Sequence, residues 1–184
     1  MLRGLAWILW LALLGCALPA SVPESPVAQA AEAPAWPDRP QGETHEATLV
    51  LVVDGDTIRV RMDGRDHPVR YIGIDTPETL PDQPPEPYGL AASDANRRLL
   101  REGSLVLERD VSETDRFGRL LRYVWVVDDV GTYTLLNREL LLGGFARVTT
   151  HPPDVRYVEE FLAAERQARA AERGLWGSRR GSTP

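Results

Sequence analysis

The chain has 184 residues, of which 43% are hydrophobic and 26% charged, which is enough for one globular domain with additional segments. Its formal net charge of −6 excludes a global positive field that would attract a polyanion, so any nucleic-acid binding must depend on a local arginine cluster or a bound metal. The single cysteine, Cys16, excludes an intramolecular disulfide and a cysteine-based metal site.

Residues 1–20 have the pattern of an export signal. Arg3 provides a short positive region, and residues 5–14 form an apolar stretch of signal-peptide length. Residues 13–16 (LLGC) resemble a bacterial lipobox, in which a lipidated Cys16 would tether the protein to a membrane. Two alternatives remain: cleavage at residues 28–30 (AQA), or a Cys16 that is simply an apolar residue of the signal. The sequence therefore predicts an exported protein, either in the bacterial cell envelope as a lipoprotein or secreted or periplasmic.

The segment after the signal is rich in proline and alanine. Its five prolines, between positions 23 and 40, exclude a helix, so residues 21–44 are expected to form a disordered linker. The folded domain is then expected over residues 45–177, with a disordered tail over residues 178–184. We expect the protein to be a monomer.

The first part of the domain has the pattern of three consecutive strands. Residues 48–53 form an apolar run that predicts a buried strand, and residues 57–62 alternate between apolar and polar side chains. The Asp-Gly pair at residues 63–64 predicts a hairpin turn into a strand over residues 67–74. Gly73 within that strand is expected to mark a bend of the kind that a small barrel needs.

The second part of the domain alternates between helices and strands. Residues 143–144 (GG) suit a left-handed helix end, and Asp154 is expected to cap the last helix. Five strands with helices between and after them predict an α+β fold, a five-stranded OB-fold β-barrel with about three packed helices. The elements expected here are helices over residues 89–101 and 135–142 and strands over residues 104–109 and 120–127.

Carboxylates stand at two of the predicted strand ends. Asp56 follows the first strand, and Asp75 and Glu78 follow the third. A carboxylate beside a hydrophobic core is costly unless a cation pairs with it. If the two strand ends meet, the three side chains form an oxygen-rich pocket of the kind that binds a hard cation, Ca²⁺ or Mg²⁺.

Four motifs follow one another along the expected domain: DGDT at residues 54–57, Arg70 with DTPE at residues 75–78, Tyr88-Gly89, and DRFGR at residues 115–119. In residues, order and spacing they resemble the staphylococcal nuclease (thermonuclease) family. Later segments, including the GGFA run at residues 143–146 and the Leu-Trp pair at residues 175–176, resemble the family's later helix and turn and its C-terminal helix end. The resemblance covers roughly residues 47–177, the whole of the expected folded domain.

The resemblance implies a Ca²⁺-dependent enzyme that hydrolyses phosphodiester bonds of DNA or RNA. Asp56 and Asp75 match the metal-binding carboxylates of the family, and Thr76 matches the residue that lends its backbone carbonyl to the metal. These assignments agree with the preference of Ca²⁺ for oxygen ligands.

The resemblance also implies three catalytic residues. Glu78 matches the residue that positions or deprotonates the attacking water, and Arg70 and Arg119 match the pair that holds the scissile phosphate. Two guanidinium groups and a metal would neutralise the negative charge that grows in the transition state. The planar fork of arginine can grip two phosphate oxygens at once, and a carboxylate near the water can accept its proton.

The chain departs from the family prototype where the nucleotide is held. Residues 149–153 contain no tyrosine, and Phe117 stands where the prototype has one. The loop over residues 81–87 is rich in proline and carries Asp82 and Glu86, whereas the prototype's loop is rich in lysine. The alternative function is a catalytically silent OB-type module that binds nucleic acid or protein. The presence of every matched catalytic position favours the enzyme.

Overall fold

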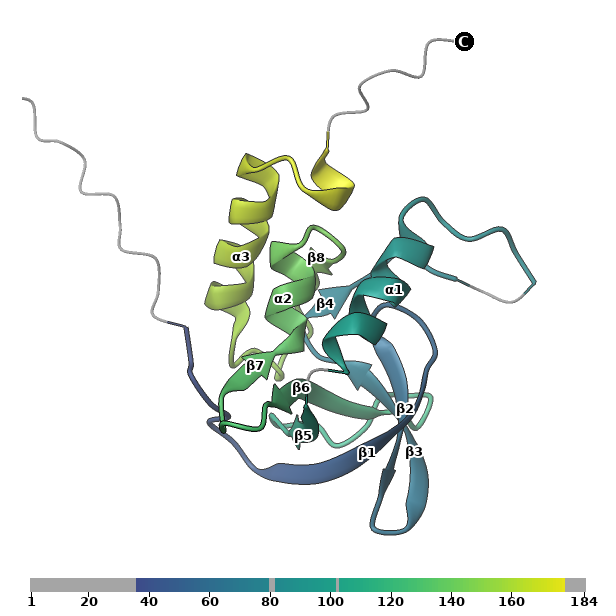
Figure 1. Ribbon diagram of the computed structural model, residues 1–184, viewed down its shortest axis with the longest axis vertical. Helices are drawn as coiled ribbons and strands as arrows, with labels where there is room; N and C mark the ends of the chain where they lie inside the picture. The colour runs from purple at the N-terminus through teal and green to yellow at the C-terminus, as the bar shows by residue number, and fades with distance from the viewer. Residues whose placement is uncertain (1–35, 80–81, 102, 178–184) are drawn as a thin grey trace, which may run out of the picture. The chain divides into compact units, whose positions relative to one another are not determined.

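A closed barrel of five strands forms the base of the domain (Figure 1). The computed structural model describes residues 36–79, 82–101 and 103–177. The expected export signal with Cys16, the linker up to residue 35 and the expected tail therefore lie outside the described residues. The barrel strands are β1 (Thr44–Val52), β2 (Thr57–Met62), β3 (Arg65–Tyr71), β5 (Ser104–Glu108) and β6 (Leu120–Val127).

The strand pairing confirms the predicted OB-type barrel. Neighbouring strands pair antiparallel in the order β3-β2-β1-β5-β6, and a parallel pairing between β3 and β6 closes the ring. The short strand β7 (Tyr133–Leu135) extends the sheet beyond β6. A closed barrel leaves no unpaired strand edge around the ring, which is the advantage of this architecture.

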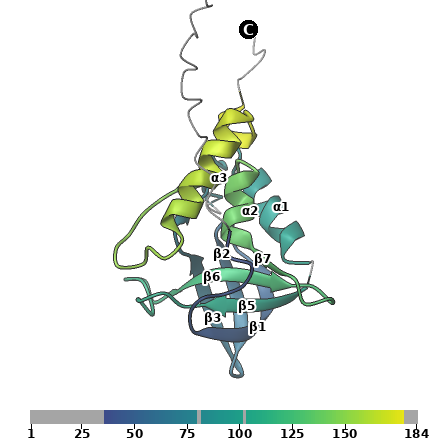
Figure 2. The same cartoon turned by 90° about the vertical axis from the view of Figure 1, so that its left-hand side faces the viewer.

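Three α-helices lie on one side of the barrel strands, as Figures 1 and 2 show. They are α1 (Gly89–Leu99), α2 (Leu136–Leu142) and α3 (Val158–Ala170), and the short 3₁₀ helix η1 (Gly174–Trp176) follows α3. A two-stranded pair of β4 (Ile74–Asp75) and β8 (Arg147–Val148) stands beside them. No helix within residues 36–79, 82–101 and 103–177 has the length and apolar character needed to cross a membrane.

The hydrophobic core fills the barrel and the contact between barrel and helices. On β2 the alternation predicted from the sequence is confirmed, because Ile58 and Val60 are buried and Arg59 and Arg61 are exposed. Residues from α2 and α3 close the core from above. Its largest fully buried apolar side chains include Trp125, Tyr71, Tyr123, Phe161, Leu140 and Leu141.

Two predicted strands differ from the observed ones. The first was expected to be buried, but Val50 and Leu51 on β1 are 40% and 46% exposed. The reason is a register irregularity between Leu49 and Leu51, which disturbs the alternation of faces. The strand expected over residues 67–74 ends at Tyr71, because Gly73 adopts a φ of 80° and turns the chain into β4.

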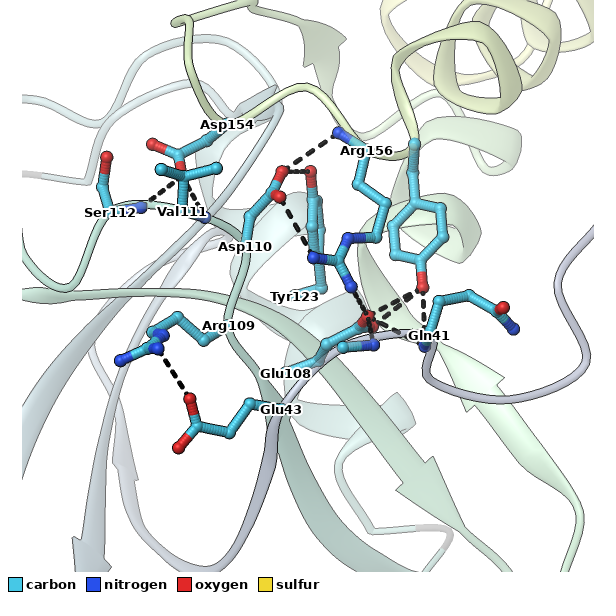
Figure 3. A network of polar contacts seen from close by, with 12 residues as sticks. Gln41, Glu43, Glu108, Arg109, Asp110, Val111, Ser112, Tyr123, Asp154 and Arg156 are labelled. Carbon is cyan, nitrogen blue, oxygen red and sulfur yellow. Dashed lines mark hydrogen bonds and ion pairs between the residues drawn. The ribbon is translucent and has the colours of Figure 1, made fainter.

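The expected cap of the last helix was wrong. α3 begins at Val158, and Asp154 lies four residues upstream. Its Oδ1 atom instead accepts hydrogen bonds from the backbone N–H groups of Val111 and Ser112, at 3.0 and 2.8 Å (Figure 3). Asp154 therefore fastens the segment that follows β5, and the loop between β5 and β6 starts from a fixed position.

Residues just upstream of the expected domain boundary pack against the barrel. The backbone N–H groups of Gln41 and Gly42 donate to Oε1 of Glu108, at 2.9 and 2.7 Å (Figure 3). Trp36 packs on the core, with the guanidinium of Arg138 5.2 Å from its ring centre. The described part of the chain thus makes specific contacts from residue 36 onward, before β1 begins at Thr44.

Candidate active site

The two acidic strand ends meet at one arginine. Asp56 precedes β2, Asp75 ends β4, and Arg70 lies on β3 opposite the start of β2. Nη1 of Arg70 lies 3.1 Å from Oδ2 of Asp56, and Nη2 lies 2.8 Å from Oδ1 of Asp75. Nη1 also donates to the carbonyl of Ile74 at 2.8 Å, which fixes the guanidinium between the strands. The fold therefore brings Arg70, Asp56 and Asp75 into direct contact.

Asp56 is buried and accepts several hydrogen bonds. Its Oδ2 atom accepts from the backbone N–H of Thr76 at 2.7 Å and from the Thr76 hydroxyl at 3.1 Å. Burial raises the pKa of Asp56 to about 7, with Arg70 opposing the shift and the Asp54 carboxylate adding to it. The raised pKa reflects the loss of hydration on burial, which the charge of Arg70 offsets only in part.

The turn that carries Asp56 is held from two sides. Oδ1 of Asp54 accepts the backbone N–H of Asp56 at 3.0 Å, and the Asp54 carbonyl accepts from Nδ2 of Asn96 at 3.2 Å. A Cβ atom at Gly55 would lie 2.6 Å from the hydroxyl oxygen of Thr76, so the close approach of these loops requires glycine. The sequence interpretation missed Asn96, although a polar residue on the apolar face of α1 is a recognisable signal.

Glu78 stands at the edge of this group and is exposed. Burial of part of its surface and the nearby Asp54 and Asp75 carboxylates raise its pKa, and Arg70 opposes that shift. Its backbone is fastened to Glu86, which accepts the Glu78 N–H at 3.2 Å and donates its own N–H to the Glu78 carbonyl at 3.0 Å. Glu78 thus combines an open position with an electrostatic coupling to the acidic group.

Arg119 lies on the loop between β5 and β6 and is oriented by Asp115. Its Nε donates to Oδ2 of Asp115 at 2.7 Å, and Oδ1 of Asp115 accepts the backbone N–H groups of Phe117 and Arg119. The two Nη atoms of Arg119 have no hydrogen-bond partner within the described part of the chain. Asp115 was part of a matched motif, but its orienting contact could not be read from the sequence.

A pocket of about 470 Å³ connects the two arginines. Arg70 and Arg119 both line it, and so do Phe117, which is 68% exposed, and His151. Arg119 makes no direct contact with Asp56, Asp75 or Glu78 in the described structure. The fold therefore joins the predicted residues into two groups, a carboxylate cluster and an arginine-lined pocket, which share Arg70.

The residues at the cluster fit a hard divalent cation. Asp56 is a buried carboxylate, Asp75 is open to solvent, and the backbone N–H and hydroxyl of Thr76 donate to Asp56. All the donors are oxygens, the ligand type that Ca²⁺ and Mg²⁺ prefer. Within the described residues, no three side chains of histidine, cysteine, aspartate or glutamate are grouped to hold a metal ion. The oxygen donors that the structure groups here are the carboxylates of Asp56 and Asp75, which Arg70 joins.

The fold and site together define an OB-type barrel with an acidic cluster and an arginine-lined pocket, and the sequence comparisons identify the family. The profile described as "Staphylococcal nuclease homologue" matches residues 68–178. "Thermonuclease" of Staphylococcus hyicus is 39% identical over 131 residues, 71% of this chain and 75% of that protein. "Endonuclease YncB" of Bacillus subtilis (strain 168) is 39% identical over 132 residues, 70% of this chain and 60% of that protein. The chain belongs to the staphylococcal nuclease homologue family, which confirms the resemblance.

Proposed function

We propose that this protein is a nuclease that hydrolyses phosphodiester bonds of DNA or RNA by metal-assisted attack of water. The observation that carries the proposal is the position of Arg70, which joins Asp56 and Asp75 and also lines the pocket with Arg119. An acidic metal-binding group next to two guanidinium groups suits a reaction in which negative charge grows on a phosphate. The names of two relatives, thermonuclease and endonuclease, support the same conclusion.

Each side chain has a role that its surroundings support. Asp56, Asp75 and the carbonyl of Thr76 would hold Ca²⁺, and the bound ion would supply positive charge to the phosphate and acidify a water. Arg119 offers two Nη atoms, which have no hydrogen-bond partner among the described residues, to phosphate oxygens while Asp115 holds its Nε. Glu78, exposed and with a raised pKa, would orient the attacking water and accept its proton.

Removal of the metal is the first test of this proposal. Exhaustive chelation is expected to lower the cleavage rate of DNA and RNA by at least about 100-fold, because metal charge stabilisation is worth several kcal/mol. Added Ca²⁺ should restore the rate, measured as initial velocity on labelled substrate. Full activity after chelation would contradict the metal role.

A matched pair of variants separates a specific role from a general loss of negative charge. Asp75→Asn should lower the rate strongly, whereas Asp94→Asn on α1 should not, and the two side chains are equally open, at 59% and 60% exposure. A wild-type protein that binds labelled DNA but never cleaves it, with or without Ca²⁺, would favour the silent binding module instead.

We also propose that the protein is exported, on the basis of the positive and apolar pattern of residues 1–20. If Cys16 is lipidated, Cys16→Ser is expected to move the protein from the membrane fraction to the soluble fraction or to block its processing. The measurement is immunoblotting of fractionated cells, with mass determination of the mature N-terminus. A soluble mature form starting near Ala31 in both proteins would support ordinary cleavage and remove the lipid tether.

A further inference from the structure

A second pocket lies on the other side of the candidate metal ligands. It has a volume of about 460 Å³, close to that of the arginine-lined pocket. Asp75 and Thr76 line this second pocket, whereas Arg70 and Ile74 line the first. The Arg70–Asp75 ion pair, 2.8 Å long, therefore stands between the two pockets. A phosphate that reacts beside this ion pair would have the arginine-lined pocket on one side and the second pocket on the other.

Arg147 supplies a guanidinium group to the second pocket. It lies on β8 directly opposite Asp75 on β4, so the backbone pairing fixes it beside the cluster. Its guanidinium lies 5.6 Å from the ring centre of Trp176, and it has no carboxylate partner in the described part of the chain. An exposed arginine that is held by an aromatic ring and not neutralised by a carboxylate is suited to bind an external anion.

Tyr88 supplies an aromatic surface to the same pocket. Its side chain is 48% exposed, although it lies at the start of α1, where its backbone has a φ of 71°. Backbone hydrogen bonds hold this turn: the N–H of Gly89 donates to the Glu86 carbonyl and the N–H of Ala92 donates to the Tyr88 carbonyl, both at 2.9 Å. An exposed tyrosine on an ordered turn, in the same pocket as an arginine, is suited to stack on a base while the arginine binds a phosphate.

The pocket also contains two carboxylates, each of which has a partner in the protein. Asp75 pairs with Arg70, and Oε2 of Glu86 accepts the backbone N–H of Glu78. Arg147 is thus the cation in this pocket that remains free for a ligand, among the residues that the structure describes.

We propose that the second pocket binds the nucleotide on the far side of the scissile phosphate, with Arg147 on its phosphate and Tyr88 against its base. This inference depends on the proposed nuclease function, because a polynucleotide must leave the reaction centre in two directions. One direction leads to the pocket of Arg119, and the other leads past Asp75 to Arg147. The ligand class is a single-stranded oligonucleotide that spans both pockets.

The test compares Arg147→Gln with wild type on an oligothymidylate of eight nucleotides at saturating Ca²⁺. We expect KM to rise about tenfold, because one charge-assisted contact is lost, with kcat within about threefold of wild type. The slope of log KM against log salt should fall by about 0.7, the value for one phosphate contact on a single strand. Arg147→Lys should recover most of the affinity, because it keeps the charge.

Arg169→Gln is the matched control, because Arg169 lies 3.8 Å from the centre of the same Trp176 ring but does not line the pocket. It should leave KM and the salt slope unchanged. An unchanged KM in Arg147→Gln, or equal effects of the two variants, would overturn the inference. If wild type cleaves neither this oligonucleotide nor longer DNA and RNA, the nuclease proposal fails. Fluorescence anisotropy of the labelled oligonucleotide then decides the binding role of Arg147 separately, by the same comparison of Kd.

Discussion

Arg119→Lys is expected to lower kcat on DNA by about 10²–10³, the loss typical of removing one preorganised donor to a developing charge. The arginine has its Nε fixed by Asp115 at 2.7 Å, and this contact aims the two Nη atoms as a fork. Lysine keeps the positive charge but has neither the Nε that Asp115 holds nor a second donor in the same plane. The variant therefore tests geometry separately from charge.

The stability of this variant should change little. The Arg119–Asp115 pair is partly exposed, and pairs of this kind contribute about 0–1 kcal/mol. Thermal unfolding and initial rates at saturating Ca²⁺ are measured together. Arg97→Lys is the control, because Arg97 also pairs with a nearby aspartate, Asp94 at 2.6 Å, but on the outside of α1. Near wild-type turnover in Arg119→Lys would remove Arg119 from the mechanism, and a strongly lowered unfolding temperature would make it structural.

The parts of the fold that follow from local patterns were predictable from the sequence. The alternation in β2 is confirmed, and the strands expected over residues 57–62 and 120–127 have the bounds of β2 and β6. Gly144 has a φ of 72° after α2, as the expected left-handed helix end requires. These features depend on neighbouring residues, so the chain encodes them within a few positions. The strand-end pattern predicted that Asp56 and Asp75 lie close together, and the structure joins both to Arg70, which the family resemblance had assigned to the scissile phosphate.

The features that were missed depend on partners far apart in the chain. Nδ2 of Asn96 donates to the carbonyl of Asp54, 42 positions away in the chain. The residues around Asn96 do not indicate which distant group it will contact. Arg122 is 1% exposed on β6 and pairs with Glu113, which fastens the loop that leads to Arg119. From sequence alone, an arginine in a strand is expected to face solvent. The packing of the barrel shows that Arg122 is buried. Long-range pairing of polar groups is set by the closed barrel and not by periodicity.

Glu108 is the clearest example of such a partner, and its replacement is expected to have the largest effect on stability. Its side chain is fully buried at the end of β5, and backbone and side-chain donors from distant segments converge on it (Figure 3). It thereby fastens the segment before β1 and the segment before α3 to the barrel. The donors are the N–H groups of Gln41 and Gly42, Nε1 of Trp125, Nη1 of Arg156 and the hydroxyl of Tyr157, at 2.7–2.9 Å.

Glu108→Gln is expected to lower the free energy of unfolding by about 3–5 kcal/mol, because the change breaks a buried ion pair and leaves donors without acceptors. The NH₂ group of glutamine would point at N–H and O–H groups that also need an acceptor. Of its two carboxylate partners, Arg156 would retain only Asp110. Urea unfolding measures the loss, with Glu46→Gln on the exposed face of β1 as a control that should change stability by less than about 0.5 kcal/mol. The catalytic rate of the folded fraction at low temperature should stay near wild type, since no described contact joins Glu108 to Arg70 or Arg119. A stable Glu108→Gln protein would mean that the segments before β1 and before α3 stay on the barrel without the carboxylate. A loss of rate without a loss of stability would mean that the active site includes the start of the loop between β5 and β6.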